Sequence, residues 1–203
     1  KITIATEGAF PPYNLTKPDG TLDGYEIELS QYLCSHMKVE CTIVPQAFDG
    51  IIPALNAGKF DAIMAGMSAT EKRKEVINFS LSYGSTGQAF ATLKGGDLEN
   101  LPLKGELFSL ATNEAGARKA AEELKPLLEG KTIGVQTASI AARFVDEYLK
   151  GAVEVREYKT TEQHDLDLVA GRVDLVMASM GYLMTVVEKP ANADMAIVGP
   201  RFQ

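Results

Sequence analysis

The chain has 203 residues, enough for one large domain or two small ones, and its 45% hydrophobic and 23% charged residues are ordinary for a folded protein. A net charge of −7 and a pI near 5.0 argue against nucleic acid and anionic membrane surfaces as partners, but not against a small anionic ligand, which responds to local charge. No apolar run approaches the ~20 residues that a membrane-spanning helix needs.

Short apolar runs alternate along the chain with segments of helical periodicity. The predicted strands are ITIAT (2–6), CTIVP (41–45), DAIMAG (61–66), QAFATLK (88–94), TIGVQT (132–137), VEVREY (153–158) and DLVMAS (174–179). The predicted helices are YEIELSQYL (25–33), FDGIIPALNAG (48–58), AGARKAAEELKPLLEG (115–130), AARFVDEYLKG (141–151) and TEQHDLDLVAG (161–171). Residues 95–114 are predicted to be an irregular surface excursion. This rhythm predicts an α/β fold with parallel or mixed sheets.

The two cysteines, Cys34 and Cys41, lie on either side of the turn between a predicted helix and a predicted strand. Packing across that turn could bring their Cα atoms within disulfide range, but two unrelated buried thiols are an equal alternative on spacing alone. A zinc site is not expected, because His36 is the only nearby residue that could add a ligand. A disulfide would indicate an oxidising compartment such as the periplasm.

The stretch MSATEKR, residues 67–73, follows a predicted buried strand and changes abruptly from apolar to charged. Ser68 or Thr70 can cap a helix that begins near Glu71, so a capped helix with a solvated basic face is one interpretation. The hydroxyls and free N–H groups of such a junction also suit an anion, and Arg73 adds a planar guanidinium for a carboxylate. The local sequence leaves both interpretations open.

One segment occurs twice in the chain. LNAGKFDAIMAGM (55–67) and LVAGRVDLVMASM (168–180) are identical at seven of thirteen positions. Two copies are too few for a solenoid, and they predict two similar α/β lobes, each with a helix that ends in Ala-Gly before a buried strand. The two strands end in comparable loops, near Gly66 and near Ser179. Because ligands bind at the carboxyl ends of parallel strands, two such loops predict a binding cleft.

Five stretches in order along the chain are characteristic: IATEGAFPPYN, DGTLDGYEIELSQYLC, FDGIIPALNAGKFDAIMAGMSATEKRKEVINFS, GKTIGVQTAS and AGRVDLVMAS. Together they span nearly the whole chain, and they resemble the periplasmic solute-binding proteins of polar amino-acid ABC importers. Within this family, the resemblance is to the lysine/arginine/ornithine-, histidine- and opine-binding proteins.

The resemblance implies a two-lobed periplasmic-binding-protein fold of type II, in which each lobe is a mixed sheet flanked by helices and the ligand lies in the interlobe cleft. Lobe 1 is expected at residues 1–88, a hinge crossing strand at 89–94, lobe 2 at 95–198 and the start of a return crossing at 199–203. Family members complete lobe 1 with a further strand and helices after that crossing. The cysteine pair falls where the basic amino-acid binders have a disulfide, so we expect that bond, a periplasmic location and a signal peptide that has been removed.

The implied function is capture of an amino acid or N-substituted amino acid by lobe closure, and its delivery to an inner-membrane ABC permease. We expect a monomer without cofactor, metal or catalytic residue. By position, Arg73 should bind the ligand α-carboxylate with help from Ser68 and from backbone N–H groups around Gly66. Two phenylalanines should sandwich the aliphatic part of the ligand, and a glutamate should contact a cationic side chain. The expected ligand-binding residues are Glu7, Phe10, Phe48, Ala65, Gly66, Met67, Ser68, Arg73, Gln136, Ser139 and Ser179.

Two departures from the family pattern bear on the ligand. Ser179 stands where an Asp usually neutralises the α-ammonium group, and Gly66 replaces a cleft serine. A site that keeps Arg73 without that Asp suits a secondary amine with its own carboxylate, for which Gly66 would provide room. Opines, which are N-carboxyalkyl or sugar-conjugated amino acids, have this shape. Alternatively, Asp165 or Glu7 binds the ammonium group of an ordinary amino acid.

Two rival functions share this architecture. A cyclohexadienyl-type dehydratase would need an acid–base group over its substrate, and Glu7 is the only candidate. His36 and His164 have no Ser or Cys partner at a recognisable spacing and are expected to be surface or helix-face residues. The ligand-binding domain of a sensor receptor would need flanking membrane helices. The sequence therefore favours transport over catalysis and sensing.

Overall fold

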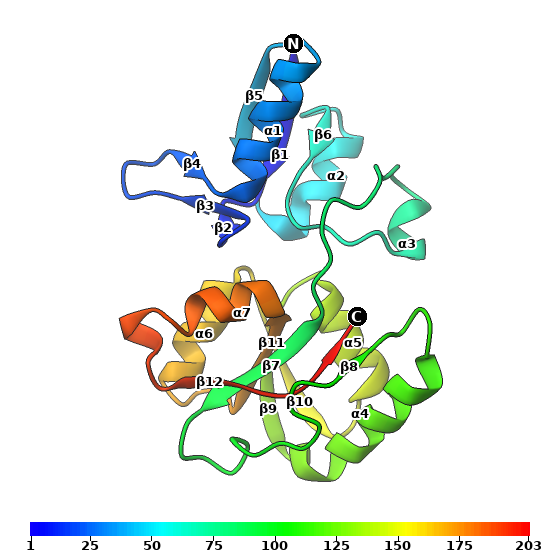
Figure 1. Ribbon diagram of the computed structural model, residues 1–203, viewed down its shortest axis with the longest axis vertical. Helices are drawn as coiled ribbons and strands as arrows, with labels where there is room; N and C mark the ends of the chain where they lie inside the picture. Colours follow the sequence, from blue (N-terminus) through cyan, green and yellow to red (C-terminus); the bar gives the residue numbers. More distant parts are fainter. The chain divides into compact units, whose positions relative to one another are not determined.

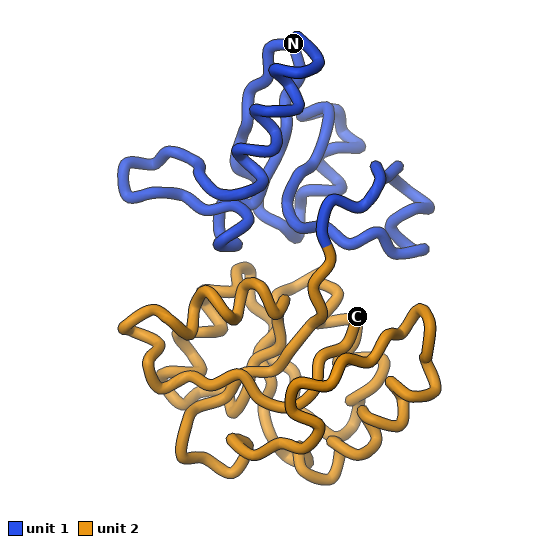
Figure 2. The backbone as a smooth tube through the Cα atoms, in the orientation of Figure 1, with its two compact units in different colours: residues 1–84 blue, residues 85–203 orange.

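The computed structural model describes all 203 residues of the chain (Figure 1). The chain folds into two compact units, unit 1 (Lys1–Gly84) and unit 2 (Ser85–Gln203), each with its own sheet (Figure 2). Each unit contains parallel strands with helices between them, as the internal repeat predicts. Neither unit has a helix of the length and apolarity that crossing a bilayer requires.

Unit 1 has a parallel sheet in the order β5–β1–β6 and a small antiparallel sheet in the order β2–β3–β4. Its strands are β1 (Ile2–Thr6), β2 (Ala9–Phe10), β3 (Asn14–Thr16), β4 (Leu22–Asp23), β5 (Cys41–Pro45) and β6 (Ala62–Ile63). Its helices are α1 (Tyr25–His36), the 3-10 turn η1 (Phe48–Gly50), α2 (Ile51–Asn56) and α3 (Glu71–Lys74). Parallel strands need crossover connections, which α1 and α2 supply, so the carboxyl ends of β1, β5 and β6 lie at one edge.

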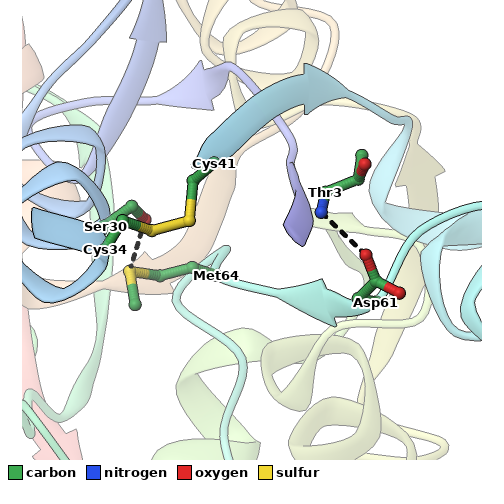
Figure 3. The surroundings of a disulfide bond; sticks show 6 residues. All are labelled: Thr3, Ser30, Cys34, Cys41, Asp61 and Met64. Carbon is green, nitrogen blue, oxygen red and sulfur yellow. Dashed lines mark hydrogen bonds between the residues drawn. A yellow bond between two sulfur atoms is a disulfide. The ribbon is translucent and has the colours of Figure 1, made fainter. Parts of the chain in front are cut away.

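A disulfide between Cys34 of α1 and Cys41 of β5 fixes this helix to the edge strand (Figure 3). The two Cα atoms are 6.1 Å apart, which confirms the bond that the family resemblance implied. Ser30, one helical turn before Cys34, donates a hydrogen bond to the Met64 sulfur at 3.1 Å (Figure 3). The inner face of α1 is therefore tied to β5 and to the residue that directly follows β6.

That inner face of α1 is only half apolar. It consists of Glu26, Ile27, Ser30 and Cys34, all at most 5% exposed, whereas Tyr32 on the opposite side is 66% exposed. The residues at 26, 30 and 34 are four positions apart and so share one side of the helix. The helix is thus oriented by the disulfide and by hydrogen bonds to Glu26 rather than by an apolar stripe.

Unit 2 has one mixed sheet of six strands in the order β10–β9–β11–β7–β12–β8. Its strands are β7 (Gln88–Leu93), β8 (Leu107–Phe108), β9 (Lys131–Gln136), β10 (Val153–Tyr158), β11 (Leu175–Ser179) and β12 (Met195–Phe202). Its helices are α4 (Glu114–Leu128), α5 (Ile140–Tyr148), α6 (Thr161–Val169), α7 (Met180–Val186) and the 3-10 turn η2 (Pro190–Asn192). Strand β7 runs antiparallel to both β11 and β12, and the β10–β9–β11 part is parallel.

Helices cover both faces of the unit 2 sheet. Ile133 and Val135 of β9 are fully buried in the core formed with α4 and α5. Gly134 lies between them and points the opposite way, where a Cβ atom would meet His164 of α6 at 3.1 Å. Helix α7 lies on the α6 side, since its Tyr182 ring is 6.4 Å from the His164 ring. This three-layer arrangement accounts for the fully buried β11.

The repeated segments have the same local structure in both units. Gly58 and Gly171, which end α2 and α6, have φ angles of 73° and 72°, a conformation that glycine adopts without a Cβ clash. Each glycine therefore terminates a helix and turns the chain into a parallel strand, which explains the shared Ala-Gly pair.

The shared Asp of the repeat also has the same role twice. Asp61 accepts a hydrogen bond from the Thr3 N–H at 2.8 Å, and Asp174 accepts one from the Thr132 N–H at 2.7 Å. In return the Asp61 and Asp174 N–H groups donate to the carbonyls of the same two threonines. Figure 3 shows the first of these pairs. The repeat therefore encodes the pairing of two neighbouring parallel strands.

The boundary between the units, at Gly84 and Ser85, precedes the expected hinge at 89–94. Strand β7 lies between β11 and β12, and its residues 89–91 are completely buried. The expected return crossing at 199–203 is largely β12, which pairs with β7 and β8. Both segments belong to the sheet of unit 2, because their hydrogen-bond partners lie there, and their role as hinges stays a prediction. The expected excursion at 95–114 is irregular apart from β8 and from Glu114, which begins α4.

Candidate functional site

Three of the expected ligand-binding segments lie at the carboxyl edge of the unit 1 sheet. Glu7 directly follows β1, Phe48 begins the turn after β5, and residues 65–68 follow β6. Because these strands are parallel, their carboxyl ends share one edge. Unit 1 thus presents a half-buried carboxylate, a buried aromatic ring and a loop at the edge where α/β proteins bind ligands.

The guanidinium group of Arg73 is oriented by its own loop. Thr70 caps α3 by accepting a hydrogen bond from the Arg73 N–H at 3.2 Å, so the predicted helix start at Glu71 is confirmed. Arg73 Nη1 donates to the Ser68 carbonyl at 2.9 Å, and Cζ lies 5.7 Å from the centre of the Phe48 ring. A hydrogen bond and a cation–π contact therefore hold the planar guanidinium in one orientation, which reduces the entropy lost when it binds a carboxylate.

Gly66 lies against Phe10 rather than beside open space. Its φ is 59°, and a Cβ atom there would be 3.2 Å from Phe10 Cε1. Its N–H donates to Glu26 Oε1 at 2.6 Å. The missing side chain of Gly66 is thus required by the backbone and by Phe10, and its own N–H is bonded to Glu26. The expected room for a ligand beside Gly66 stays a prediction, as do contacts of the neighbouring N–H groups with a ligand carboxylate.

The residues on either side of Gly66 face the core of unit 1. Ala65 is 3% exposed and packs with Ala5 and Ile51, and Met67 packs against the same cluster. The Ala65 side chain therefore serves packing. The Ser68 carbonyl holds Arg73, as described above, and contact of these residues with a ligand stays a prediction.

The expected residues of unit 2 lie at the corresponding edge of its sheet. Gln136 ends β9 and Ser179 ends β11, and both are buried at the carboxyl ends of parallel strands. Gln136 Nε2 donates to the Lys159 carbonyl at 3.1 Å. Ser139 caps α5 by accepting a hydrogen bond from the Ala142 N–H at 3.1 Å. These three polar side chains thus organise the edge of unit 2.

The Ser179 hydroxyl lies 2.7 Å from the Thr86 hydroxyl. Directly after it, the Met180 N–H donates to the Gly87 carbonyl at 2.8 Å. The residue that stands in place of the family's Asp therefore fixes the first residues of unit 2 to the end of β11.

The buried pair His164 and Asp165 lies in α6. His164 is fully buried, with Nδ1 3.0 Å from Asp165 Oδ1, so it is a helix-face residue and not a surface one, whereas His36 is exposed. Asp165 is 4% exposed and accepts a hydrogen bond from the Tyr182 hydroxyl. Burial raises the pKa of the Tyr182 hydroxyl, and the nearby Asp165 charge raises it further. Asp165 is thus engaged within unit 2, which leaves Glu7 as the candidate to bind a cationic group.

Sequence reasoning missed a buried carboxyl group behind the loop of unit 1. Glu26 is 0% exposed and accepts hydrogen bonds from the Gly66 N–H, the Asn14 side chain and the Tyr83 hydroxyl. Burial raises the pKa of the Tyr83 hydroxyl, and the nearby Glu26 charge raises it further. The only available signal was the spacing of residues 26, 30 and 34, which places Glu26 on the side of α1 that carries the cysteine.

The chain contains no group of three or more His, Cys, Asp or Glu side chains arranged to hold a metal ion.

Comparison with known proteins identifies the family. Residues 2–132 match the model of the bacterial extracellular solute-binding proteins, family 3. The chain belongs to this family. The solute-binding protein is 47% identical over 201 residues to the octopine-binding periplasmic protein of Rhizobium meliloti, a match that covers 99% of this chain and 68% of that one. It is 35% identical over 206 residues to the L-arginine-binding protein of Pseudomonas aeruginosa, covering 98% and 69%.

Solved structures of this family confirm the predicted two-lobed α/β fold. An ancestral arginine-binding protein bound to arginine superposes with a TM-score of 0.82 at 32% identity, covering 98% of this chain and 78% of that one. The arginine-binding protein from T. maritima gives 0.82 at 27% identity, covering 100% and 78%. The relatives also confirm the predicted periplasmic location, since the family is extracellular and the octopine-binding relative is named as periplasmic.

Proposed function

We propose that this solute-binding protein captures an octopine-type ligand, an N-carboxyalkyl derivative of a basic amino acid, for import through an ABC permease. The observation that carries the proposal is the half-site of unit 1. Its edge combines the oriented Arg73 guanidinium with the Glu7 carboxylate and the rings of Phe10 and Phe48. A ligand with a carboxylate, an aliphatic stem and a cationic end matches these groups in charge and in polarity.

The choice between an opine and an ordinary amino acid depends on the amine. Asp165 is buried and accepts a hydrogen bond from Tyr182, and Ser179 carries no charge. Neither residue therefore supplies a carboxylate for a primary ammonium group at the edge of unit 2. In an opine, two carboxylates of the ligand flank the secondary amine. The amine therefore needs less negative charge from the protein, because the second ligand carboxylate already balances its positive charge. The higher identity to the octopine-binding relative than to the arginine-binding one supports the same choice.

The relatives are binding proteins, and catalysis is not part of the proposal. The only candidate acid–base group for a dehydratase was Glu7, and its place directly after β1, at the carboxyl edge of the unit 1 sheet, fits contact with a ligand cation. No observation favours a sensor domain. Delivery to a permease and capture by lobe closure are taken from the family resemblance and stay predictions.

The proposal is tested by removing the Arg73 guanidinium and titrating the protein with octopine in a calorimeter. Hydrogen bonds to a charged partner are worth ~1.5–3 kcal/mol each, so Arg73→Ala should weaken octopine binding ~10- to 150-fold or more. Lys72→Ala is the matched control, because Lys72 is an exposed cation on the same short helix and its loss changes the net charge equally. Equal affinities of the two variants would place the ligand carboxylate elsewhere.

A further inference from the structure

Glu26 connects three segments of unit 1 that are far apart in the sequence. Its carboxyl group is fully buried at the start of α1. Oε1 accepts hydrogen bonds from the Gly66 N–H at 2.6 Å and from the Tyr83 hydroxyl, and Oε2 accepts one from Asn14 Nδ2 at 2.7 Å. Both oxygens are therefore engaged, and every one of these partners is a donor.

The Asn14 branch reaches the loop after β1. Asn14 is fully buried, and its Oδ1 accepts the Gly8 N–H at 2.7 Å while its Nδ2 donates to Glu26. These two bonds fix the orientation of the amide, because an exchange of oxygen and nitrogen would break both. Gly8 lies between Glu7 and Phe10, so Glu26 supports that part of the half-site through Asn14.

The Gly66 branch supports the other part of the half-site. Gly66 contacts Phe10 and lies two residues before Ser68, whose carbonyl holds the Arg73 guanidinium. A shift of the Gly66 backbone therefore moves the contact surface of Phe10 and the anchor of Arg73 together.

The Tyr83 branch reaches the end of unit 1. Residues 78–86 form no helix or strand, and Tyr83 precedes the last residue of unit 1. The hydroxyl of Tyr83 bonds to Glu26, and its carbonyl lies 3.5 Å from the Tyr25 hydroxyl, at the limit of a hydrogen bond. The bond to Glu26 is thus the stronger link between this irregular segment and the body of unit 1.

We infer that Glu26 is a positioning residue for ligand binding: it does not touch the ligand but holds the Gly66 loop and the Tyr83 segment in one fixed arrangement. This inference rests on the proposed function in that residues 66–73 are taken to bind the ligand. Binding at the Gly66 loop then also orders residues 78–86, because both share Oε1 of Glu26. A purely structural Glu26 would stabilise the fold without linking these two segments.

Tyr83→Phe tests the inference with the smallest change, since it removes one hydroxyl and keeps the ring. Tyr25→Phe is the matched control, because it removes a neighbouring hydroxyl that does not contact Glu26. Each variant is titrated with octopine, and amide hydrogen exchange is followed in peptides covering residues 60–70 and 78–86, with and without octopine.

In the unmodified protein, octopine should slow exchange in both peptides. Tyr83→Phe should keep that protection at 60–70, lose it at 78–86, and weaken octopine binding about tenfold, whereas Tyr25→Phe should resemble the unmodified protein. Unchanged affinity and unchanged protection at 78–86 in Tyr83→Phe would overturn the inference.

Glu26→Gln gives a readout that needs no ligand. The amide NH₂ of the new glutamine would face one of the three donors, and the hydrogen bond to that donor would be lost. Amide hydrogen exchange in both peptides, 60–70 and 78–86, should therefore be faster in the ligand-free, folded variant. If exchange rises in neither peptide, or in only one of them, the link through Glu26 is refuted. Absence of octopine binding to the unmodified protein would instead refute the proposed function, so the two failures are distinguishable.

Discussion

The contact between Gly66 and Phe10 predicts a selective loss of ligand affinity in Gly66→Ala. An L-residue at φ 59° costs ~1–2 kcal/mol of stability in the left-handed region. The new methyl would also lie 3.2 Å from Phe10 Cε1, closer than ordinary van der Waals contact, and 3.4 Å from Cδ1. Phe10 must therefore move, at a cost of ~1–3 kcal/mol for overpacking, which corresponds to ~5- to 150-fold weaker binding if the ring contacts the ligand.

Gly58→Ala separates the two effects. Gly58 has φ 73°, and a Cβ atom there would meet nothing within 4 Å. In urea unfolding, both variants should lose a similar amount of stability, because each places an L-residue in the left-handed region. Gly66→Ala should lose more, because its methyl group also crowds Phe10. Only Gly66→Ala should lose octopine affinity in calorimetry. If both variants bind octopine as the unmodified protein does, Phe10 is not part of the ligand site and the half-site argument is wrong.

Two further predictions concern the scaffold. Cys34→Ser/Cys41→Ser removes the disulfide and should lower the free energy of unfolding by ~2–3 kcal/mol, because the bond closes a short loop. An unchanged thermal transition in this variant would contradict the prediction. So would a mass of the unmodified protein that corresponds to two free thiols. A hydrogen bond from Tyr158 and a second one from Arg172 hold the pKa of Asp167 in the folded protein below its usual range. The Asp167 carboxylate therefore stabilises the fold above pH ~4, and this stabilisation is lost as the pH falls through the lower pKa of the folded state. The difference in Tm between the unmodified protein and Asp167→Asn should thus be largest above pH ~5 and shrink towards pH 3; an equal difference at pH 7 and pH 3 would refute this.

The sequence predicted the elements that depend on local pattern. Strands β1, β5, β6, β7, β9, β10 and β11, helices α1 to α6 and the Thr70 cap follow from periodicity and capping residues, whereas β2, β3, β4, β8, β12 and α7 were not predicted. The repeat correctly indicated two similar units, because each copy carries its own helix stop and its own Asp for strand pairing. The disulfide needed the family resemblance, since spacing alone left it open.

The support of the candidate site could not be predicted in the same way. Glu26 is fully buried although it is charged, and Tyr32 on the same helix is exposed although it is apolar, so hydropathy gives the wrong inner face for α1. Glu26 is buried because its three donors come from β3, from the loop after β6 and from the end of unit 1. Such long-range partners leave no periodic signal. The contact of Gly66 with Phe10 was missed for the same reason, because Phe10 is distant in sequence.

The most direct test of the central claim is calorimetric titration of the unmodified, ligand-stripped protein with octopine and with arginine at the same pH and ionic strength. The account predicts binding of one octopine per chain, with a dissociation constant lower than that for arginine. Tighter binding of arginine, or no heat of binding with octopine, would contradict it.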